Sequence, residues 1–184
     1  LIVGGFEGVY EFSRNFRNEG MDRTHNPEFT VLELYVAYKD YNWMMKAMED
    51  LLGNVAQSVH GKTVVTLAGK EIDFTPPYAR VTMRDAILEH TNVDIDNLDE
   101  DGLREACKTL NIDTDASMGK GKLIDEIFGE KCEHLYIQPT FITDYPVDMS
   151  PLTKVHRDNP NYTERFELMI NGTEVANAYS ELND

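Results

Sequence analysis

Apolar and polar positions alternate over two stretches near the start of the chain. In residues 9–17 the aromatic side chains occupy one parity and the polar side chains the other, which predicts a strand with one buried face. Residues 28–38 are rich in β-branched and aromatic side chains and predict a second strand. The segment 18–27 between them is rich in Gly, Asn, Asp and Pro. We therefore expect an antiparallel hairpin whose loop is longer than a hairpin needs, which is often where function lies.

The spacing of apolar residues changes to three and four after Asp40. This pattern predicts an amphipathic helix over 40–60 with Asp40 as its N-cap. Two short runs at 63–67 and 71–74 then predict a second hairpin. The proline pair at 76–77 is expected to end this β region.

Residues 82–134 carry a helical pattern instead. Thr82 with Asp85 resembles a capping box, and Asp99 and Ser117 are the expected N-caps of two further helices. The acidic residues of this segment lack the ligand spacing and the glycine of a calcium loop, so we interpret them as a solvated face. Its GKGK run lacks the spacing of a phosphate-binding loop and indicates a loop or a helix start.

Strand patterns return after residue 135, and an Asn171-Gly172 pair separates the last two alternating runs. Such a pair is the strongest short signal for a hairpin. The order strands, helices, strands predicts an α+β fold, in which flanking helices cover an antiparallel sheet and a helical insertion interrupts it. We divide the chain into a first core part at 1–81, the insertion at 82–134 and a second core part at 135–184.

The last hairpin brings two carboxylates together. A two-residue turn at Asn171-Gly172 places position 170 opposite 173, 169 opposite 174 and 167 opposite 176. Glu167 and Glu174 then lie diagonally on one face, within reach of one hard cation. Like charges this close destabilise a sheet unless something neutralises them. A pair of solvent-exposed glutamates is the alternative.

Two further glutamates lie beside aromatic side chains on predicted strands. Glu33 shares a parity with Phe29 and Tyr35, and Glu181 follows Tyr179 by two residues. A carboxylate within a sheet is costly to bury unless it meets a cation or a hydrogen-bond donor. Beside an aromatic ring it suits an ammonium or guanidinium group. For each glutamate a surface position is the alternative.

Arg17 and Glu19 end the first predicted strand beside the long loop. The guanidinium group is a permanent fork of donors that suits phosphate oxygens, although a surface ion pair is the commoner role of a single arginine. The histidines show no metal-ligand spacing, and no Ser-His-Asp or Cys-His arrangement is recognisable. Zinc chemistry and covalent nucleophiles are therefore disfavoured.

Composition restricts the partners. The chain has 33 acidic residues against 17 Lys and Arg, a net charge of −16, which argues against generic nucleic-acid binding. No apolar stretch approaches the roughly 18 residues that span a bilayer, and no signal-type segment opens the chain. We therefore expect no membrane partner and a cytoplasmic protein. The two cysteines, Cys107 and Cys132, suit a reducing compartment.

Several motifs occur in a fixed order. FRNEG, HNPEFT and LELYVAYKDY lie within 16–41, and IQPTFITDYPVDMSPL and RFELMINGTEVANAYSELND lie within 137–184. Together they resemble motif 2 and the later catalytic strands of class II aminoacyl-tRNA synthetases, in the form found in lysyl-tRNA synthetases. The resemblance implies the antiparallel catalytic sheet of that class. It covers the chain except for the helical segment.

The resemblance implies the roles of the site residues. Arg17 would be the catalytic arginine that contacts the ATP α-phosphate and the amino-acid carboxylate. The residues implied in binding ATP are Arg17, Glu19, His25, Asn26 and Phe29. The residues implied in holding magnesium on the ATP phosphates are Glu167 and Glu174. The residues implied in binding lysine are Glu33, Tyr35, Asn177, Tyr179 and Glu181.

These roles conflict with a regular last strand. In an unbroken strand Glu174 and Asn177 point to opposite faces, yet the implied roles need them in one cavity. We therefore predict a β-bulge near Val175–Ala176. Relatives can carry Phe where Tyr179 stands, so the hydroxyl group there is a departure from the pattern.

The implied reaction joins lysine to ATP. The lysine carboxylate attacks the α-phosphorus, which gives lysyl-adenylate and pyrophosphate, and the lysyl group then passes to tRNA(Lys). The dimer-forming motif 1, motif 3 and the anticodon-binding domain do not occur in the sequence, so we expect a fragment that is inactive alone, with the full-length protein a homodimer. Two alternatives remain: a paralogue that lysylates a protein such as a translation factor, and a non-catalytic ligand-binding module.

Overall fold

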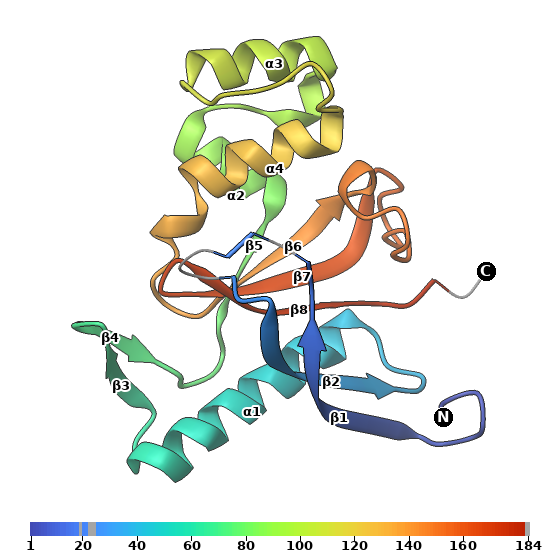
Figure 1. Ribbon diagram of the computed structural model, residues 1–184, viewed down its shortest axis with the longest axis vertical. Helices are drawn as coiled ribbons and strands as arrows, with labels where there is room; N and C mark the ends of the chain where they lie inside the picture. The colour runs from blue at the N-terminus through green and yellow to red at the C-terminus, as the bar shows by residue number, and fades with distance from the viewer. Residues whose placement is uncertain (19, 22–24, 183–184) are drawn as a thin grey trace. The chain divides into compact units, whose positions relative to one another are not determined.

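The computed structural model describes residues 1–18, 20–21 and 25–182 (Figure 1). The chain forms two compact units, residues 1–39 and 40–184. The first unit is the expected antiparallel hairpin, in which β1 (Gly8–Phe16) pairs with β2 (Glu28–Val36). The prediction that the aromatic face of the first strand is buried is wrong for this structure, because Tyr10, Phe12 and Phe16 are exposed. The three-part division at residues 81 and 134 stays a prediction.

The second unit begins with the expected long helix. Helix α1 (Tyr41–His60) starts at Asp40, whose side chain accepts a hydrogen bond from the Trp43 backbone N–H at 3.1 Å. It ends at Gly61, whose φ of 69° lies in the left-handed region that favours glycine. The expected short hairpin follows as β3 (Val64–Leu67) and β4 (Lys70–Asp73).

The main sheet has the strand order β5-β6-β7-β8. Its strands are β5 (Ala79–Thr82), β6 (Thr140–Pro146), β7 (Tyr162–Ile170) and β8 (Thr173–Tyr179). The expectation that Pro76 and Pro77 end the β region is wrong, because β5 follows them and pairs in parallel with β6. A parallel pair needs a long crossover, and the helical segment supplies it. The sheet is therefore mixed, with its other pairs antiparallel.

The crossover contains α2 (Met83–Thr91), α3 (Glu100–Thr109) and α4 (Lys120–Lys131), with short 3₁₀ turns beside them at 95–97 and 133–135. The Thr82 and Asp99 caps are confirmed, since their side chains accept the N–H groups of Asp85 and Gly102. The Ser117 cap is wrong, and α4 begins after Gly119. The Asp115 carboxylate accepts both the backbone N–H and the hydroxyl of Ser117, so that hydroxyl is engaged in a turn before the helix.

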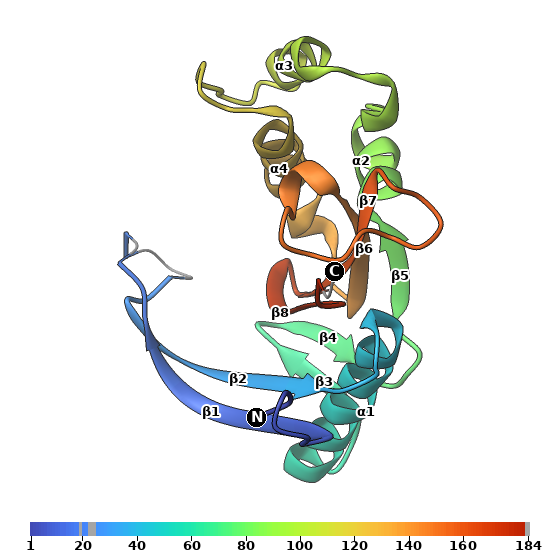
Figure 2. The same cartoon turned by 90° about the vertical axis from the view of Figure 1, so that its right-hand side faces the viewer.

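The two faces of the main sheet pack against different helices (Figure 2). Phe166 and Leu168 of β7 lie in a core cluster with Tyr41 and Met45 of α1. Met169 lies in a second cluster that α2, α3 and α4 supply. Because side chains alternate along a strand, residues with the parity of Met169 point toward the crossover side of the sheet.

Helix α4 approaches a backbone segment closely at Gly121. A Cβ atom there would lie 2.5 Å from the Asp148 carbonyl oxygen, which is too close for any side chain. We expect Gly121→Ala to lower the free energy of unfolding by about 1–3 kcal/mol, measured by urea denaturation. Gly129 of the same helix has room for a Cβ atom, so Gly129→Ala is the matched control and should be neutral or stabilising by up to about 1 kcal/mol. Equal effects at both positions would contradict the close packing.

Candidate active site

The hairpin of the first unit gathers its predicted site residues on one face. In the register of β1 and β2, Asn15 pairs with Phe29 and Val9 with Tyr35. Phe29, Glu33 and Tyr35 alternate with residues of the other face, so their side chains project to the same side. Arg17 follows β1 with the parity of Asn15 and extends this face toward the loop.

Arg17 is held by two contacts within this unit. Its backbone N–H donates to the Pro27 carbonyl oxygen at 2.9 Å. Its guanidinium carbon lies 5.3 Å from the centre of the Phe29 ring, a distance typical of a cation–π interaction. The strand pairing therefore brings the predicted phosphate ligand beside the predicted adenine platform. Arg17 keeps its guanidinium group exposed to solvent.

Glu33 lies directly opposite Glu11, a residue that the sequence interpretation did not single out. Both residues are exposed in this unit, so Glu33 here is a surface carboxylate. Like charges directly opposite each other on a sheet are destabilising, and a bound cation would relieve the repulsion. The alternating pattern of β1 contained the signal for Glu11, but its partner depends on the register. Of the predicted loop residues, His25 and Asn26 are exposed, and Glu19 lies outside the described residues.

The last hairpin of the second unit has the expected turn. Asn171 and Gly172 both have positive φ, 54° and 72°, and Ile170 pairs with Thr173. The predicted bulge is confirmed, because Met169 pairs with Glu174 but Leu168 pairs with Ala176, which leaves Val175 without a partner residue on β7. The expected pairing of position 167 with 176 is therefore wrong, and Glu167 pairs with Asn177.

The bulge places the predicted metal and lysine residues of this unit on one face. Met169 lies opposite Glu174, and Glu167 lies opposite Asn177. Glu167 and Met169 share a parity, so Glu174 and Asn177 project to the same side of the sheet in spite of the odd spacing between them. Without the extra residue, Asn177 would point to the α1 side.

The carboxylates on this face have raised pKa values. Burial raises the pKa of Glu167, and the guanidinium of Arg165, 2.6 Å away, opposes that rise. Although Glu174 keeps an exposed surface, the protein atoms around its carboxyl group displace solvent and raise its pKa to about 7, and the charge of Glu167 adds to the effect. Burial and the charge of Glu167 also raise the pKa of Glu133, which the sequence interpretation did not identify. The face therefore carries more negative charge than its protein neighbours balance.

This donor set suits magnesium. Mg²⁺ is usually held by one or two carboxylates together with substrate phosphates and water. Glu167 and Glu174 offer such oxygen atoms, and their raised pKa values indicate carboxylates that a cation would stabilise. Among the described residues there is no group of three or more His, Cys, Asp or Glu side chains arranged to hold a metal ion. Two carboxylates of this kind can hold an ion whose remaining ligands are water or phosphate oxygen atoms.

The same carboxylates make stability depend on pH. Because the folded-state pKa of Glu174 is raised from 4.5 to about 7, the folded state retains a proton that the unfolded chain releases. In metal-free buffer the free energy of unfolding should fall as pH rises from about 4.5 to about 7. Glu174→Gln should reduce this fall, measured by urea denaturation across that range. Glu130→Gln on the exposed side of α4 is the control and should retain the full fall; an unchanged slope in Glu174→Gln would contradict the assignment.

A small cavity of about 220 Å³ lies beside these strands. Two predicted lysine ligands, Asn177 and Tyr179, line it. Glu181 follows β8 and forms an isolated backbone bridge with Thr153, another lining residue, and its side chain is exposed. The lining residues are Ser150, Pro151, Leu152, Thr153, Arg165, Asn177 and Tyr179.

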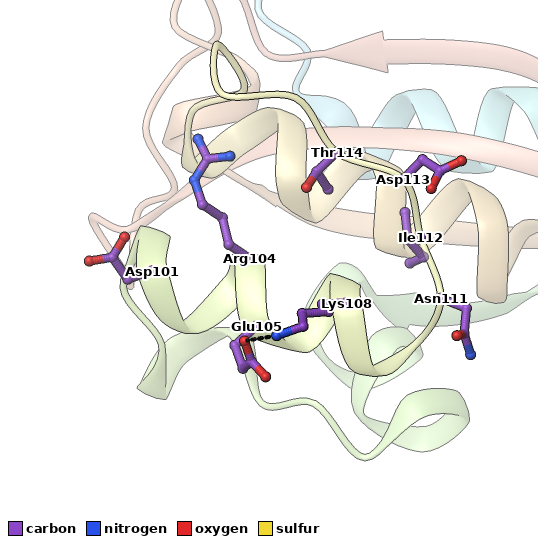
Figure 3. A pocket seen from close by; sticks show the side chains of 8 residues that line it. All are labelled: Asp101, Arg104, Glu105, Lys108, Asn111, Ile112, Asp113 and Thr114. Carbon is purple, nitrogen blue, oxygen red and sulfur yellow. Dashed lines mark hydrogen bonds and ion pairs between the residues drawn. The ribbon is translucent and has the colours of Figure 1, made fainter.

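A larger hollow of about 510 Å³ lies on the crossover and contains none of the predicted residues (Figure 3). It lies along α3 and the segment after it, and its cations already have partners. Lys108 pairs with Glu105 at 3.4 Å, and Arg104 donates to the Asp115 carbonyl oxygen at 2.9 Å. Arg104 thus stabilises the segment that connects α3 to α4, and we assign this hollow no catalytic or binding role.

Comparison with known proteins identifies the family. The model of the family described as "tRNA synthetases class II (D, K and N)" matches residues 1–184. The chain belongs to this family. As a class II synthetase sequence it is 68% identical over its full length to the "Lysine--tRNA ligase" of Porphyromonas gingivalis, 66% to that of Christiangramia forsetii and 61% to that of Azobacteroides pseudotrichonymphae. The resemblance to class II lysyl-tRNA synthetases is thereby confirmed.

The class II synthetase chain spans only about a third of these relatives. It covers 32% of the first two proteins and 37% of the third, while each alignment includes all 184 residues. Over residues 1–18, 20–21 and 25–182, no helix has both the length and the apolar character to cross a membrane.

Proposed function

We propose that the protein containing this chain activates lysine with ATP and transfers it to tRNA(Lys). Identities of 61–68% to proteins named lysine–tRNA ligase, over all 184 residues, carry the proposal. The common face of Glu167, Glu174 and Asn177 supports it, because that face combines carboxylates for cations with an amide for the amino acid. A homodimer in the cytoplasm belongs to the same proposal, as does inactivity of the 184 residues alone.

In this proposal the first unit binds the nucleotide. Arg17 orients the α-phosphate and the lysine carboxylate and neutralises the charge that develops between them. Phe29 stacks on adenine, Glu19 contacts the adenine amino group, and His25 and Asn26 lie over ATP. No general base is required, since the attacking carboxylate is already an anion.

The proposed lysine and magnesium ligands select by charge. Glu33 and Glu181 balance the ε-ammonium group, while Tyr35, Asn177 and Tyr179 orient the rest of the amino acid. Glu167 and Glu174 would hold magnesium, which supplies charge neutralisation on the phosphates when bound. An aspartate-specific enzyme would need cations where these glutamates stand.

ATP–pyrophosphate exchange by the complete protein tests this proposal. We expect exchange that depends on lysine and is absent with aspartate or asparagine. Acylation should then label tRNA(Lys) rather than a purified translation factor. Lysine-dependent exchange with labelling of the protein alone would favour the protein-modifying paralogue. Lysine binding without exchange would identify a non-catalytic module.

A further inference from the structure

Arg165 on β7 joins the proposed lysine pocket to the proposed metal site. Its guanidinium group donates to three side chains: Nη1 to Ser150 Oγ at 2.6 Å, Nε to Asn177 Oδ1 at 3.1 Å and Nη2 to Glu167 Oε1 at 2.6 Å. Its Cζ atom also lies 4.4 Å from the centre of the Tyr145 ring. Only 18% of the side chain is exposed, so the fork is fixed in one orientation.

These contacts determine the orientation of the Asn177 amide. An arginine can only donate and an ionised glutamate can only accept. Asn177 therefore turns Oδ1 to Arg165 and one N–H of Nδ2 to Glu167 Oε1, at 3.3 Å. The flipped amide would place its NH₂ group against the guanidinium and its oxygen against the carboxylate. The other N–H of Nδ2 is directed to the Glu174 carboxylate, and it would change partner when an oxygen acceptor fills the cavity that Asn177 lines.

We propose that Arg165 is a positioning residue that presents the N–H of Asn177 to an oxygen acceptor of the bound amino acid. The inference rests on the proposed function, because it takes lysine as the occupant of the 220 Å³ cavity. Arg165 acts through Asn177, and the hydrogen bond from its Nη1 to the Ser150 hydroxyl helps to hold Arg165 in place. Lysine affinity thus depends on a side chain whose own contacts are to protein.

A double-mutant cycle in the complete protein tests this inference. Isothermal titration with lysine alone, without ATP or magnesium, measures the dissociation constant. Arg165→Met should raise that constant by about 10- to 100-fold, as for other residues that orient a ligand-binding side chain. Asn177→Ala should raise it by a comparable factor, and the double variant should be no weaker than Asn177→Ala, since Arg165 then has nothing left to orient. Arg165→Lys should not restore affinity, because it keeps the charge but lacks the fork.

Two controls separate positioning from folding. Arg84→Met removes an arginine that pairs with Asp94 on the crossover, away from the cavity, and should leave lysine affinity unchanged. Ser150→Ala keeps Arg165 but removes one of the hydrogen bonds that hold its guanidinium group. This variant should weaken lysine binding less than Arg165→Met does, and it replaces Arg165→Met in the test if that variant does not fold. Additive effects in the double variant, full rescue by Arg165→Lys or normal affinity in Arg165→Met would overturn the inference alone. Wild-type protein that binds no lysine would instead overturn the proposed function as well.

Discussion

Arg17→Ala in the complete protein should lower the rate of lysine adenylation by about 100- to 1000-fold, the usual effect of losing one preorganised donor to developing charge. The strand pairing holds the Arg17 backbone, and the Phe29 ring lies beside the guanidinium group, so both side chains are on the same face of the hairpin before any ligand binds. The loss should appear mainly in kcat of ATP–pyrophosphate exchange, because the stabilised charge develops in the transition state.

Arg14→Ala provides the matched control for this prediction. Arg14 lies on β1, three residues before Arg17. It is also exposed and pairs with Thr30, but its parity places it on the opposite face of the hairpin. Its removal should leave exchange close to wild type. Comparable losses in the two variants would mean that the face of β1 does not matter, and Arg17 would lose its catalytic role.

Glu181→Ala should abolish most of the affinity for lysine. The Glu181 carboxylate is exposed in this structure, and the proposed complex buries it against the lysine ammonium group. Removing one partner of such a desolvated ion pair costs roughly 3–5 kcal/mol, which corresponds to a dissociation constant about 150- to 5000-fold higher. Glu181→Gln should lose nearly as much, because the amide keeps the shape but not the charge. Calorimetric titration of the complete protein with lysine measures both values.

Norleucine distinguishes charge from packing in this experiment. Its side chain has a similar length to that of lysine but lacks the ε-ammonium group. The wild-type protein should therefore bind norleucine weakly, and the Glu181 variants should bind norleucine as well as the wild-type protein does. Glu130→Ala, an exposed acid on α4, should bind lysine normally. Normal lysine binding by Glu181→Ala would show that this carboxylate, exposed in the structure, also stays solvated in the complex.

Local sequence signals predicted most of the elements. The Asn171-Gly172 pair has the φ values that a two-residue hairpin turn demands, and Asp40, Thr82 and Asp99 cap helices as their side-chain chemistry predicts. The bulge at Val175 was predictable for a different reason. The implied roles place Glu174 and Asn177 in one cavity, but their odd spacing puts them on opposite faces of a regular strand. Only an extra residue in the strand brings both to the same face.

The features that could not be predicted from the sequence depend on contacts between residues far apart in the chain. Strand β5 has only four residues, and its partner β6 begins about sixty residues later, so no local pattern marks it. The bulge also shifts the partner of Glu167 from 176 to 177, which brings Asn177 opposite that carboxylate. Arg165 was overlooked because its partners Tyr145 and Ser150 lie on other segments, and arginine within a strand has no pattern of its own.

In the proposed site, carboxylates balance two positive charges: a magnesium ion at Glu167 and Glu174, and the lysine ammonium group at Glu181. A crystal structure of the complete protein with lysine, a non-hydrolysable ATP analogue and Mn²⁺ in place of Mg²⁺ tests both. The anomalous signal of manganese should lie between the nucleotide phosphates and the Glu167 and Glu174 carboxylates, with the lysine Nζ atom paired to Glu181. Manganese bound elsewhere, or a lysine whose ammonium group faces bulk solvent, would contradict the account.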